Sequence, residues 1–289
     1  LELNLISFIP LILGAKRNQE AEGATKYFLP QALSSAIMLL MATFMWYSHS
    51  TLCEPLLILS MLLKLGAAPC HFWFPQVMSS MSWGNCFLLT TWQKLAPLML
   101  LCFMFPTSSP IIYPTVILNT FLGGLLGLNQ TRLQPLLAYS SITHMGWMIS
   151  GMIINSPHLC MIYFMFYCLI IFPVFAILIF YKSKTPKQFS KFRMIMLLVL
   201  PILLLSLGGL PPTTGFLPKW LLIQALITNH QVMIILMLIG SYMNLFFYLT
   251  LAFSALPTIS FNHSSGGRKK KTLLVTLSTS LLGLLTLMP

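Results

Sequence analysis

Apolar segments of about 20 residues recur along almost the whole chain, and this feature limits the possible folds more than any other. A helix of about 20 apolar residues spans the hydrocarbon core of a bilayer. The pattern therefore predicts an all-α fold, a polytopic bundle of transmembrane helices. We place about ten such segments, at 1–14, 28–47, 54–78, 85–104, 111–128, 134–153, 159–181, 193–227, 232–252 and 272–288.

The scarcity of charge excludes a soluble domain. Only 7% of the residues are Asp, Glu, Lys or Arg, and 57% are hydrophobic. A soluble domain carries about 25% charged residues, which cover its surface in water. Disorder is excluded too, because it requires low hydrophobicity.

Two of the segments, 54–78 and 193–227, are too long for one straight span of about 20 residues. Each has helix-breaking residues near its middle, such as Gly66 and Pro69 in the first and the stretch 208–218 in the second. We expect two broken membrane helices. Corresponding interrupted helices in the two halves of a transporter are typical of inverted repeats with an ion path near the bilayer midplane.

The chain is therefore expected to form a single domain over residues 1–289. Its repeat halves would be roughly 1–104 and 111–252, followed by a final helix at 272–288.

Basic residues gather on alternate connections. The chain has 16 Lys and Arg against 4 acidic residues, a formal net charge of +12. All but three of these cations lie in or beside 15–27, 129–133, 182–192 and 253–271, and the intervening connections carry none. In a membrane protein this bias marks the side facing the cytoplasm or matrix, so no nucleic-acid partner is expected. A site for phospholipid head groups is the alternative reading of the clusters at 182–193 and 268–271.

The remaining cations, Lys64, Lys94 and Lys219, lie inside apolar segments. A Lys at the centre of a membrane helix costs about 2.5–3.5 kcal/mol on the insertion scale. Three such residues indicate function rather than structure.

Glu2 is the acidic residue most suited to accompany them, because it lies in the apolar sequence LELNLISFIPLIL. We expect Glu2 to pair with Lys64, since a carboxylate within about 4–6 Å stabilises the ammonium. A lysine that gains and loses such stabilisation can bind and release a proton. Glu20, Glu22 and Glu54 are expected to be in contact with solvent.

His144, in LAYSSITHMGW, is the remaining candidate. Imidazole titrates near neutral pH, so His144 could bridge Lys94 to Lys219, or it could be a neutral, hydrogen-bonded core residue. His71 is interpreted as structural. The six cysteines are scattered, which supports neither a disulfide framework nor a zinc site.

Long blocks of the sequence resemble the antiporter-like membrane-arm subunits of mitochondrial NADH–ubiquinone oxidoreductase, the respiratory complex I. They include KLGAAPCHFWFP, LLTTWQKLAP, GGLLGLNQTRLQPLLAYSSITHMGWM and LLSLGGLPPTTGFLPKW. The resemblance implies that Glu2, Lys64, Lys94 and Lys219 occupy the family's ion-path positions. It also implies a partial chain, because family members begin with another helix before the one that carries the Glu.

What the resemblance implies is a core subunit of a proton-translocating enzyme complex in the mitochondrial inner membrane, with its basic loops facing the matrix. Protons would pass through Glu2, Lys64, Lys94, His144 and Lys219. NADH, FMN, iron–sulfur clusters and ubiquinone would bind to partner subunits, with no cofactor in this chain. Its partners would be other membrane-arm subunits and phospholipid. Two alternatives stay open, a Na⁺/H⁺ antiporter subunit and a structural subunit that does not pump.

Overall fold

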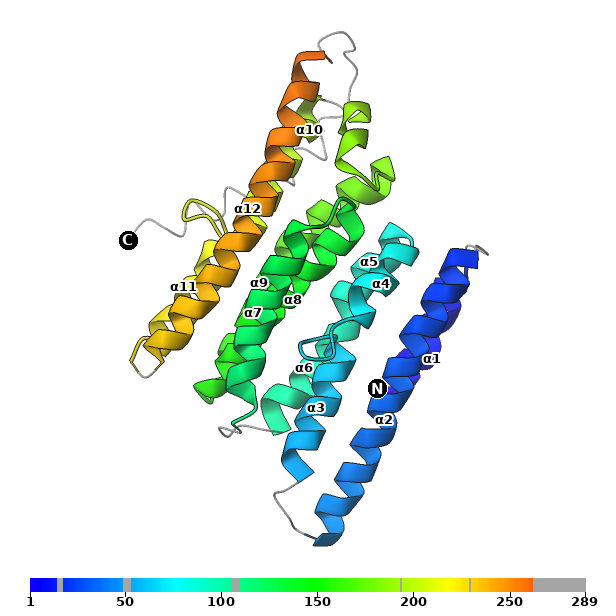
Figure 1. Ribbon diagram of the computed structural model, residues 1–289, viewed down its shortest axis with the longest axis vertical. Helices are drawn as coiled ribbons and strands as arrows, with labels where there is room; N and C mark the ends of the chain where they lie inside the picture. Colours follow the sequence, from blue (N-terminus) through cyan, green and yellow to red (C-terminus); the bar gives the residue numbers. More distant parts are fainter. Residues whose placement is uncertain (15–17, 49–52, 105–109, 193, 229, 262–289) are drawn as a thin grey trace.

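The computed structural model describes residues 1–14, 18–48, 53–104, 110–192, 194–228 and 230–261. Within these ranges the secondary structure is helical, with no strand, and the helices lie side by side in one bundle (Figure 1). The expected all-α fold is confirmed. The helix expected at 272–288 lies outside the described residues.

The bundle begins with α1 (Glu2–Leu13), α2 (Asn18–Ser48), α3 (Glu54–Leu65), α4 (Trp73–Ser80), α5 (Trp83–Thr90) and α6 (Trp92–Met104). It continues with α7 (Ile112–Leu128), α8 (Leu133–Ile153), α9 (Pro157–Tyr181), the 3₁₀ helix η2 (Pro186–Lys191), α10 (Met194–Gly208), α11 (Phe216–Leu226) and α12 (Gln231–Phe261). Within the described residues, four stretches are long and apolar enough to cross a membrane: Asn18–Tyr47, Trp83–Phe103, Pro157–Tyr181 and Gln231–Ser254.

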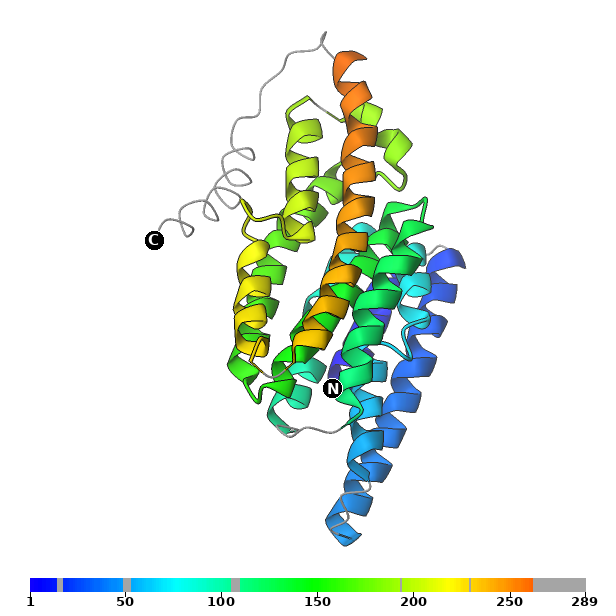
Figure 2. The same cartoon turned by 60° about the vertical axis from the view of Figure 1, so that its left-hand side comes forward.

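Helix α8 is the centre of the bundle. Every residue of α8 except Tyr139 is buried, and the helix contacts α4, α7, α9, α11 and α12. A helix buried on all sides belongs to the core. Figure 2 shows α12 running along the outside of the bundle, where it packs on α7 and α10. Polar residues of α8 are thus enclosed by protein.

The first broken helix is formed by α3 and α4. Gly66 follows α3 in the left-handed conformation, with φ +67° and ψ 32°, and its N–H donates to the Leu63 carbonyl at 3.2 Å. A Cβ at this position would lie 2.9 Å from Phe74. Glycine therefore satisfies both the backbone angle and the close approach.

The second broken helix is formed by α10 and α11. Gly209 follows α10 with φ +80°, and its N–H donates to the carbonyls of Leu205 and Ser206. Pro211 and Pro212 come next and cannot extend the helix, which restarts at Phe216. Both interruptions predicted from the sequence are confirmed. The inverted-repeat relation between the two halves stays a prediction.

One local expectation was wrong. Helix α2 begins at Asn18 rather than at residue 28, so Glu20 lies in its first turn and is only 3% exposed instead of lying in a solvated loop. The expected segment 85–104 corresponds to the stretch Trp83–Phe103, with a local interruption where α5 ends at Thr90 and α6 begins at Trp92. The Thr90 and Thr91 hydroxyls both donate to the Phe87 carbonyl, at 3.0 and 2.8 Å, and such side-chain bonds compete with the helix ladder.

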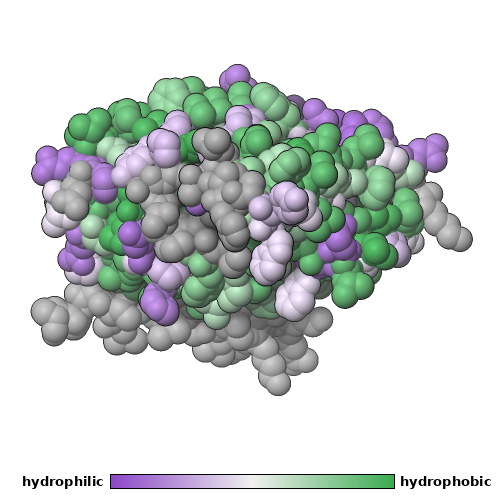
Figure 3. Space-filling model, turned by 90° about the horizontal axis from the view of Figure 1, so that it is seen from below, coloured by the Kyte–Doolittle hydropathy of each residue, from purple (hydrophilic) through white to green (hydrophobic). Residues whose placement is uncertain are grey.

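The outer surface is largely apolar. Trp46 and Tyr47 at the end of α2 are 87% and 91% exposed, and large exposed apolar side chains recur on most of the outer helices. Figure 3, a view of the lower end, shows hydrophobic residues over much of the visible surface with hydrophilic residues in separate groups. Exposed Arg132, Lys182 and Lys184 lie at one end of the bundle, where the Leu133 N–H donates to the Lys184 carbonyl at 2.9 Å. Which side of the membrane that end faces stays a prediction.

Candidate functional site

The three intramembrane lysines are buried in protein and do not reach out to the surface. Lys64, Lys94 and Lys219 are 6%, 2% and 5% exposed. Each stands beside an interruption of a helix. Lys64 is in the last turn of α3, Lys94 is in the first turn of α6 and Lys219 is in the first turn of α11. Irregular backbone at membrane depth is tolerated only where protein or a water-filled cavity surrounds it.

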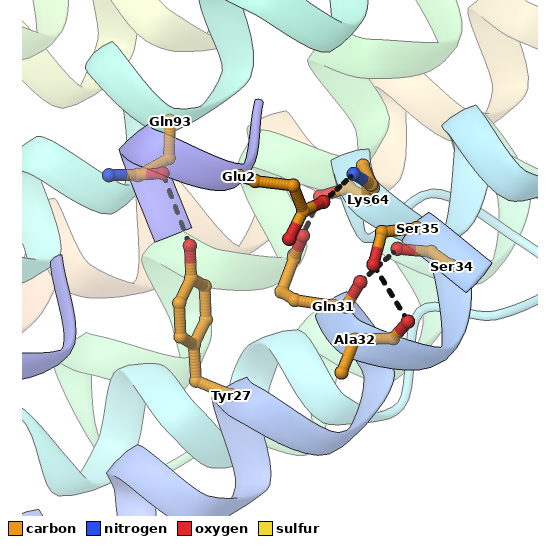
Figure 4. Close-up of polar contacts among 8 residues, drawn as sticks. All are labelled: Glu2, Tyr27, Gln31, Ala32, Ser34, Ser35, Lys64 and Gln93. Carbon is orange, nitrogen blue, oxygen red and sulfur yellow. Dashed lines mark hydrogen bonds and ion pairs between the residues drawn. The ribbon is translucent and has the colours of Figure 1, made fainter. Parts of the chain in front are cut away.

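Glu2 and Lys64 form an ion pair, as the sequence predicted. The Lys64 ammonium lies 3.2 Å from the Glu2 carboxylate, and Figure 4 shows the two side chains pointing toward each other from α1 and α3. The Lys64 side chain is 3% exposed, whereas that of Glu2 is 51% exposed. The carbonyls at the end of α3 add a second source of stabilisation for the positive charge.

Polar side chains from neighbouring helices satisfy the backbone around the first break. Gln31 of α2 donates to the Lys64 carbonyl and Trp73 of α4 donates to the Leu63 carbonyl, each at 3.1 Å. Asn119 of α7 accepts the Ala68 N–H at 2.7 Å. The break is therefore held by side chains of α2, α4 and α7.

A separate polar contact runs toward Lys94. The Tyr27 hydroxyl donates to Gln93 at 3.1 Å, and Gln93 in turn donates to Asn4 at 3.2 Å (Figure 4 shows the first contact). Gln93 directly precedes Lys94, so α1, α2 and α6 are joined near the start of α6.

Lys94 has only uncharged neighbours among the contacts described. Its ammonium donates to the Ser141 hydroxyl at 3.1 Å and lies 4.6 Å from the centre of the Phe74 ring. Phe74 belongs to α4 and Ser141 to α8. Lys94 therefore connects the first broken helix to the central helix, without a carboxylate to stabilise its charge.

His144 lies one turn after Ser141 on α8. Its Nδ1 is 3.0 Å from the Tyr163 hydroxyl, and its ring centre is 5.1 Å from that of Tyr167 on α9. Lys94 contacts Ser141, three residues before His144, and Lys219 lies near the Trp147 ring, three residues after it, although neither lysine forms a hydrogen bond with His144 in the described part of the chain. The position fits the expected bridge, and its role stays a prediction.

Lys219 is held by the second break. Its ammonium donates to the Gly208 carbonyl at 2.8 Å and lies 5.8 Å from the centre of the Trp147 ring. A Cβ at Gly209 would lie 2.9 Å from the same nitrogen. The Gly-Gly pair thus makes room for the lysine and presents a carbonyl to it.

Three positions on α8 organise the site. Ser141, His144 and Trp147 are spaced by three residues and form one row on the helix surface. They meet Lys94, Tyr163 and Lys219 respectively. At 1.5 Å per residue the row covers about 9 Å along the helix. This row of α8 thus lies between Lys94 of α6 and Lys219 of α11.

The sequence alone did not identify several members of this site. Ser141, Tyr163 and Asn119 join the site through contacts between helices far apart in the sequence. His71, at the first break, is 1% exposed, and neither ring nitrogen has a hydrogen-bond partner among the described residues, so its structural interpretation stays a prediction.

The chain is similar in sequence to one family of membrane proteins. Residues 45–244 match the family described as NADH:quinone oxidoreductase/Mrp antiporter, TM. A protein of Lumbricus terrestris is 44% identical over 264 residues, 89% of this chain and 79% of that one, and a protein of Mus musculus is 38% identical over 273 residues, 90% and 79% respectively. Both relatives are named NADH-ubiquinone oxidoreductase chain 2.

Solved structures share the fold. A chain of respiratory complex I from Thermus thermophilus superimposes with a TM-score of 0.80 at 24% identity, covering 98% of this chain and 73% of that one. A chain of the Mrp complex from Dietzia gives 0.69 at 15% identity, covering 87% and 52% respectively. These likenesses establish the arrangement of the helices.

Proposed function

The chain belongs to the family of NADH-ubiquinone oxidoreductase chain 2, and from this premise we propose that it carries protons across the membrane through Glu2, Lys64, Lys94, His144 and Lys219. As a member of this family it is an integral membrane subunit of the antiporter-like kind in respiratory complex I. The observation that carries the proposal is the row on α8, in which Ser141 contacts Lys94, Trp147 contacts Lys219, and His144 lies between them in sequence and contacts Tyr163.

The differing surroundings of the lysines support a relay. Lys64 has a carboxylate and the end of α3, and Lys219 has the Gly208 carbonyl, whereas Lys94 has a hydroxyl and an aromatic ring. Positive charge is thus stabilised least at Lys94. Because the three ammonium groups have different neighbours, they hold their protons with different strength, and a proton can move from one lysine to another.

In this mechanism Lys64 exchanges a proton with Lys94 when its pairing with Glu2 changes. His144, or water beside it, passes the proton from Lys94 to Lys219. Transfer across a membrane potential costs about 2.3 kcal/mol per charge per 100 mV, so an external source of free energy is required. Electron transfer from NADH to ubiquinone in the partner subunits would supply it.

The proposed partners are the other membrane-arm subunits, including neighbouring antiporter-like ones, and phospholipid. NADH, FMN, iron–sulfur clusters and ubiquinone would bind to those other subunits, and this chain would act as the translocating part of the enzyme. Its own residues would bind protons and release them.

We also propose that the chain lies in the mitochondrial inner membrane, with the end that carries Arg132, Lys182 and Lys184 facing the matrix. The excess of cations on alternate connections supports this orientation.

Replacing Lys64, Lys94 or Lys219 by Met in the assembled complex tests the relay. Met keeps the length and apolar body of the side chain and removes the ammonium. The readout is the number of protons moved per NADH oxidised in sealed vesicles, with Lys184→Met at the exposed end as the control. The proposal expects a lower ratio for each buried lysine and an unchanged ratio for the control. Unchanged ratios throughout would instead favour a structural subunit.

A Na⁺/H⁺ antiporter subunit is the second candidate, supported by the matched family's description. Sodium ions prefer oxygen ligands. Among the described contacts of the three buried lysines, Glu2 supplies the carboxylate. Vesicles prepared with and without Na⁺ separate the two functions. Proton movement that is independent of Na⁺ supports the relay, and movement that requires Na⁺ supports the antiporter.

A further inference from the structure

Two buried thiols meet between α6 and α9. The sulfur atoms of Cys102 and Cys160 lie 2.9 Å apart, and the two residues are 2% and 0% exposed. Both are free cysteines. A disulfide bond is about 2.05 Å long, so an approach of about 0.9 Å would join them.

We propose that Cys102 and Cys160 are a modification site, a thiol pair that hydrogen peroxide converts into a disulfide joining α6 to α9. Burial alone does not produce such a pair. Cys86 is equally buried, yet its sulfur faces the backbone carbonyls of Met78 and Met81, at 3.4 and 4.0 Å.

The proposal requires a small oxidant to reach the pair from the nearby helix ends. Cys102 lies two residues before the end of α6, and Cys160 lies near the start of α9. Both helix ends are at the lower end of the bundle in Figure 1. Hydrogen peroxide is small and uncharged, so it can enter where a bulky or charged oxidant cannot.

The reaction balances in two steps. One cysteine thiol gives up its proton and its sulfur attacks an oxygen of hydrogen peroxide; the O–O bond breaks, a sulfenic acid forms, and the departing hydroxide takes that proton and leaves as water. The second cysteine sulfur then attacks the sulfenic sulfur, the S–S bond forms, and the hydroxyl leaves as water with the proton of the second thiol. Two thiols lose two electrons in total, and the peroxide gains them.

The disulfide would affect the proposed proton path, because each cysteine lies close to a residue of that path on its own helix. On α6, Lys94, Leu98 and Cys102 follow at intervals of four residues and are all buried, so they share one face. On α9, Cys160 lies one turn before Tyr163, the partner of His144. The disulfide would tie the helix of Lys94 to the helix that contacts His144. If the proposed function holds, the linked protein moves fewer protons per NADH.

Mass spectrometry of native membranes tests the pair. Membranes are treated with hydrogen peroxide, denatured, alkylated with a maleimide and digested without reductant. We expect a linked peptide that contains Cys102 and Cys160, disappears after dithiothreitol, and is accompanied by loss of alkylation at both residues. Cys86 should stay alkylated. Equal alkylation of all three residues, or separate sulfinic acids at Cys102 and Cys160, would overturn the proposal.

The consequence for pumping is measured on the same samples. We expect peroxide to lower the ratio of protons to NADH, dithiothreitol to restore it, and Cys102→Ser or Cys160→Ser to abolish the peroxide effect. A linked peptide with an unchanged ratio would overturn the consequence and leave the thiol pair in place. Failure of the proposed relay is detected separately, because it is tested by the lysine variants in the absence of oxidant.

Discussion

The Lys219 ammonium donates a 2.8 Å hydrogen bond to the carbonyl of Gly208, the last residue of α10. Lys64 likewise lies in the last turn of its half-helix, α3. Both broken helices thus present the negative end of a helix dipole to a lysine. Lys94 stands in the first turn of α6, as Lys219 does in α11, but its ammonium donates to the Ser141 hydroxyl and not to a carbonyl at a helix end. We infer that, of the three buried lysines, Lys94 most readily releases a proton.

Replacing Gly209 by Ala should displace Lys219. The left-handed backbone costs a non-glycine residue about 1–2 kcal/mol, and the new Cβ would lie 2.9 Å from the ammonium. We expect lower thermal stability of the complex and fewer protons per NADH. Gly84→Ala is the control, because nothing lies within 4 Å of a Cβ there. Equal behaviour of the two variants would contradict the role given to the second break.

Replacing Glu2 by Gln should affect pumping more than stability. The Glu2 side chain is 51% exposed, so its ion pair with Lys64 should contribute less than about 1 kcal/mol to folding. Loss of the carboxylate nevertheless removes the counter-charge of Lys64. We expect a reduced proton-to-NADH ratio with little change in the unfolding temperature. Glu22→Gln, which breaks the surface pair with Lys26, should leave the ratio unchanged.

Replacing Ser141 by Ala should impair Lys94. Ser141 accepts a hydrogen bond from the ammonium, and bonds to charged groups are worth about 1.5–3 kcal/mol. We expect the rate of proton translocation to fall. Ser150→Ala is a matched control, since Ser150 is also buried in α8 but donates only to the Trp147 carbonyl among the contacts described. A fall of similar size in both variants would point to general damage to α8.

Replacing Tyr163 by Phe tests the position of His144. The change removes the hydroxyl 3.0 Å from Nδ1 and keeps the ring. We expect slower proton translocation at unchanged assembly. Tyr113→Phe is the comparison, because Tyr113 contacts His230 through its ring, at 5.4 Å between centres. If Tyr163→Phe pumps as well as Tyr113→Phe, the Tyr163 contact is not part of the path.

The sequence was sufficient for the parts of the site that have a local signature. Lysines in apolar segments, and glycine and proline in segments too long for one span, predicted both broken helices and the Glu2–Lys64 contact. The partners Ser141 and Tyr163 could not be predicted, because they depend on how helices distant in sequence pack. The buried Glu20 was also missed, because the start of α2 has too few apolar residues to be recognised as helix.

The central claim, that protons pass along the α8 row, is tested most directly by a structure of the intact complex that resolves water. Asn244 of α12 donates through its amide nitrogen to the Thr143 hydroxyl, next to His144 on α8. His144 Nε2 and Asn244 Oδ1 are buried and have no hydrogen-bond partner in the described part of the chain. Buried polar groups are nearly always paired with protein or water. We predict ordered water at both atoms, continuing to the ammonium groups of Lys94 and Lys219. A dry row, with both lysines in contact only with protein, would contradict the relay.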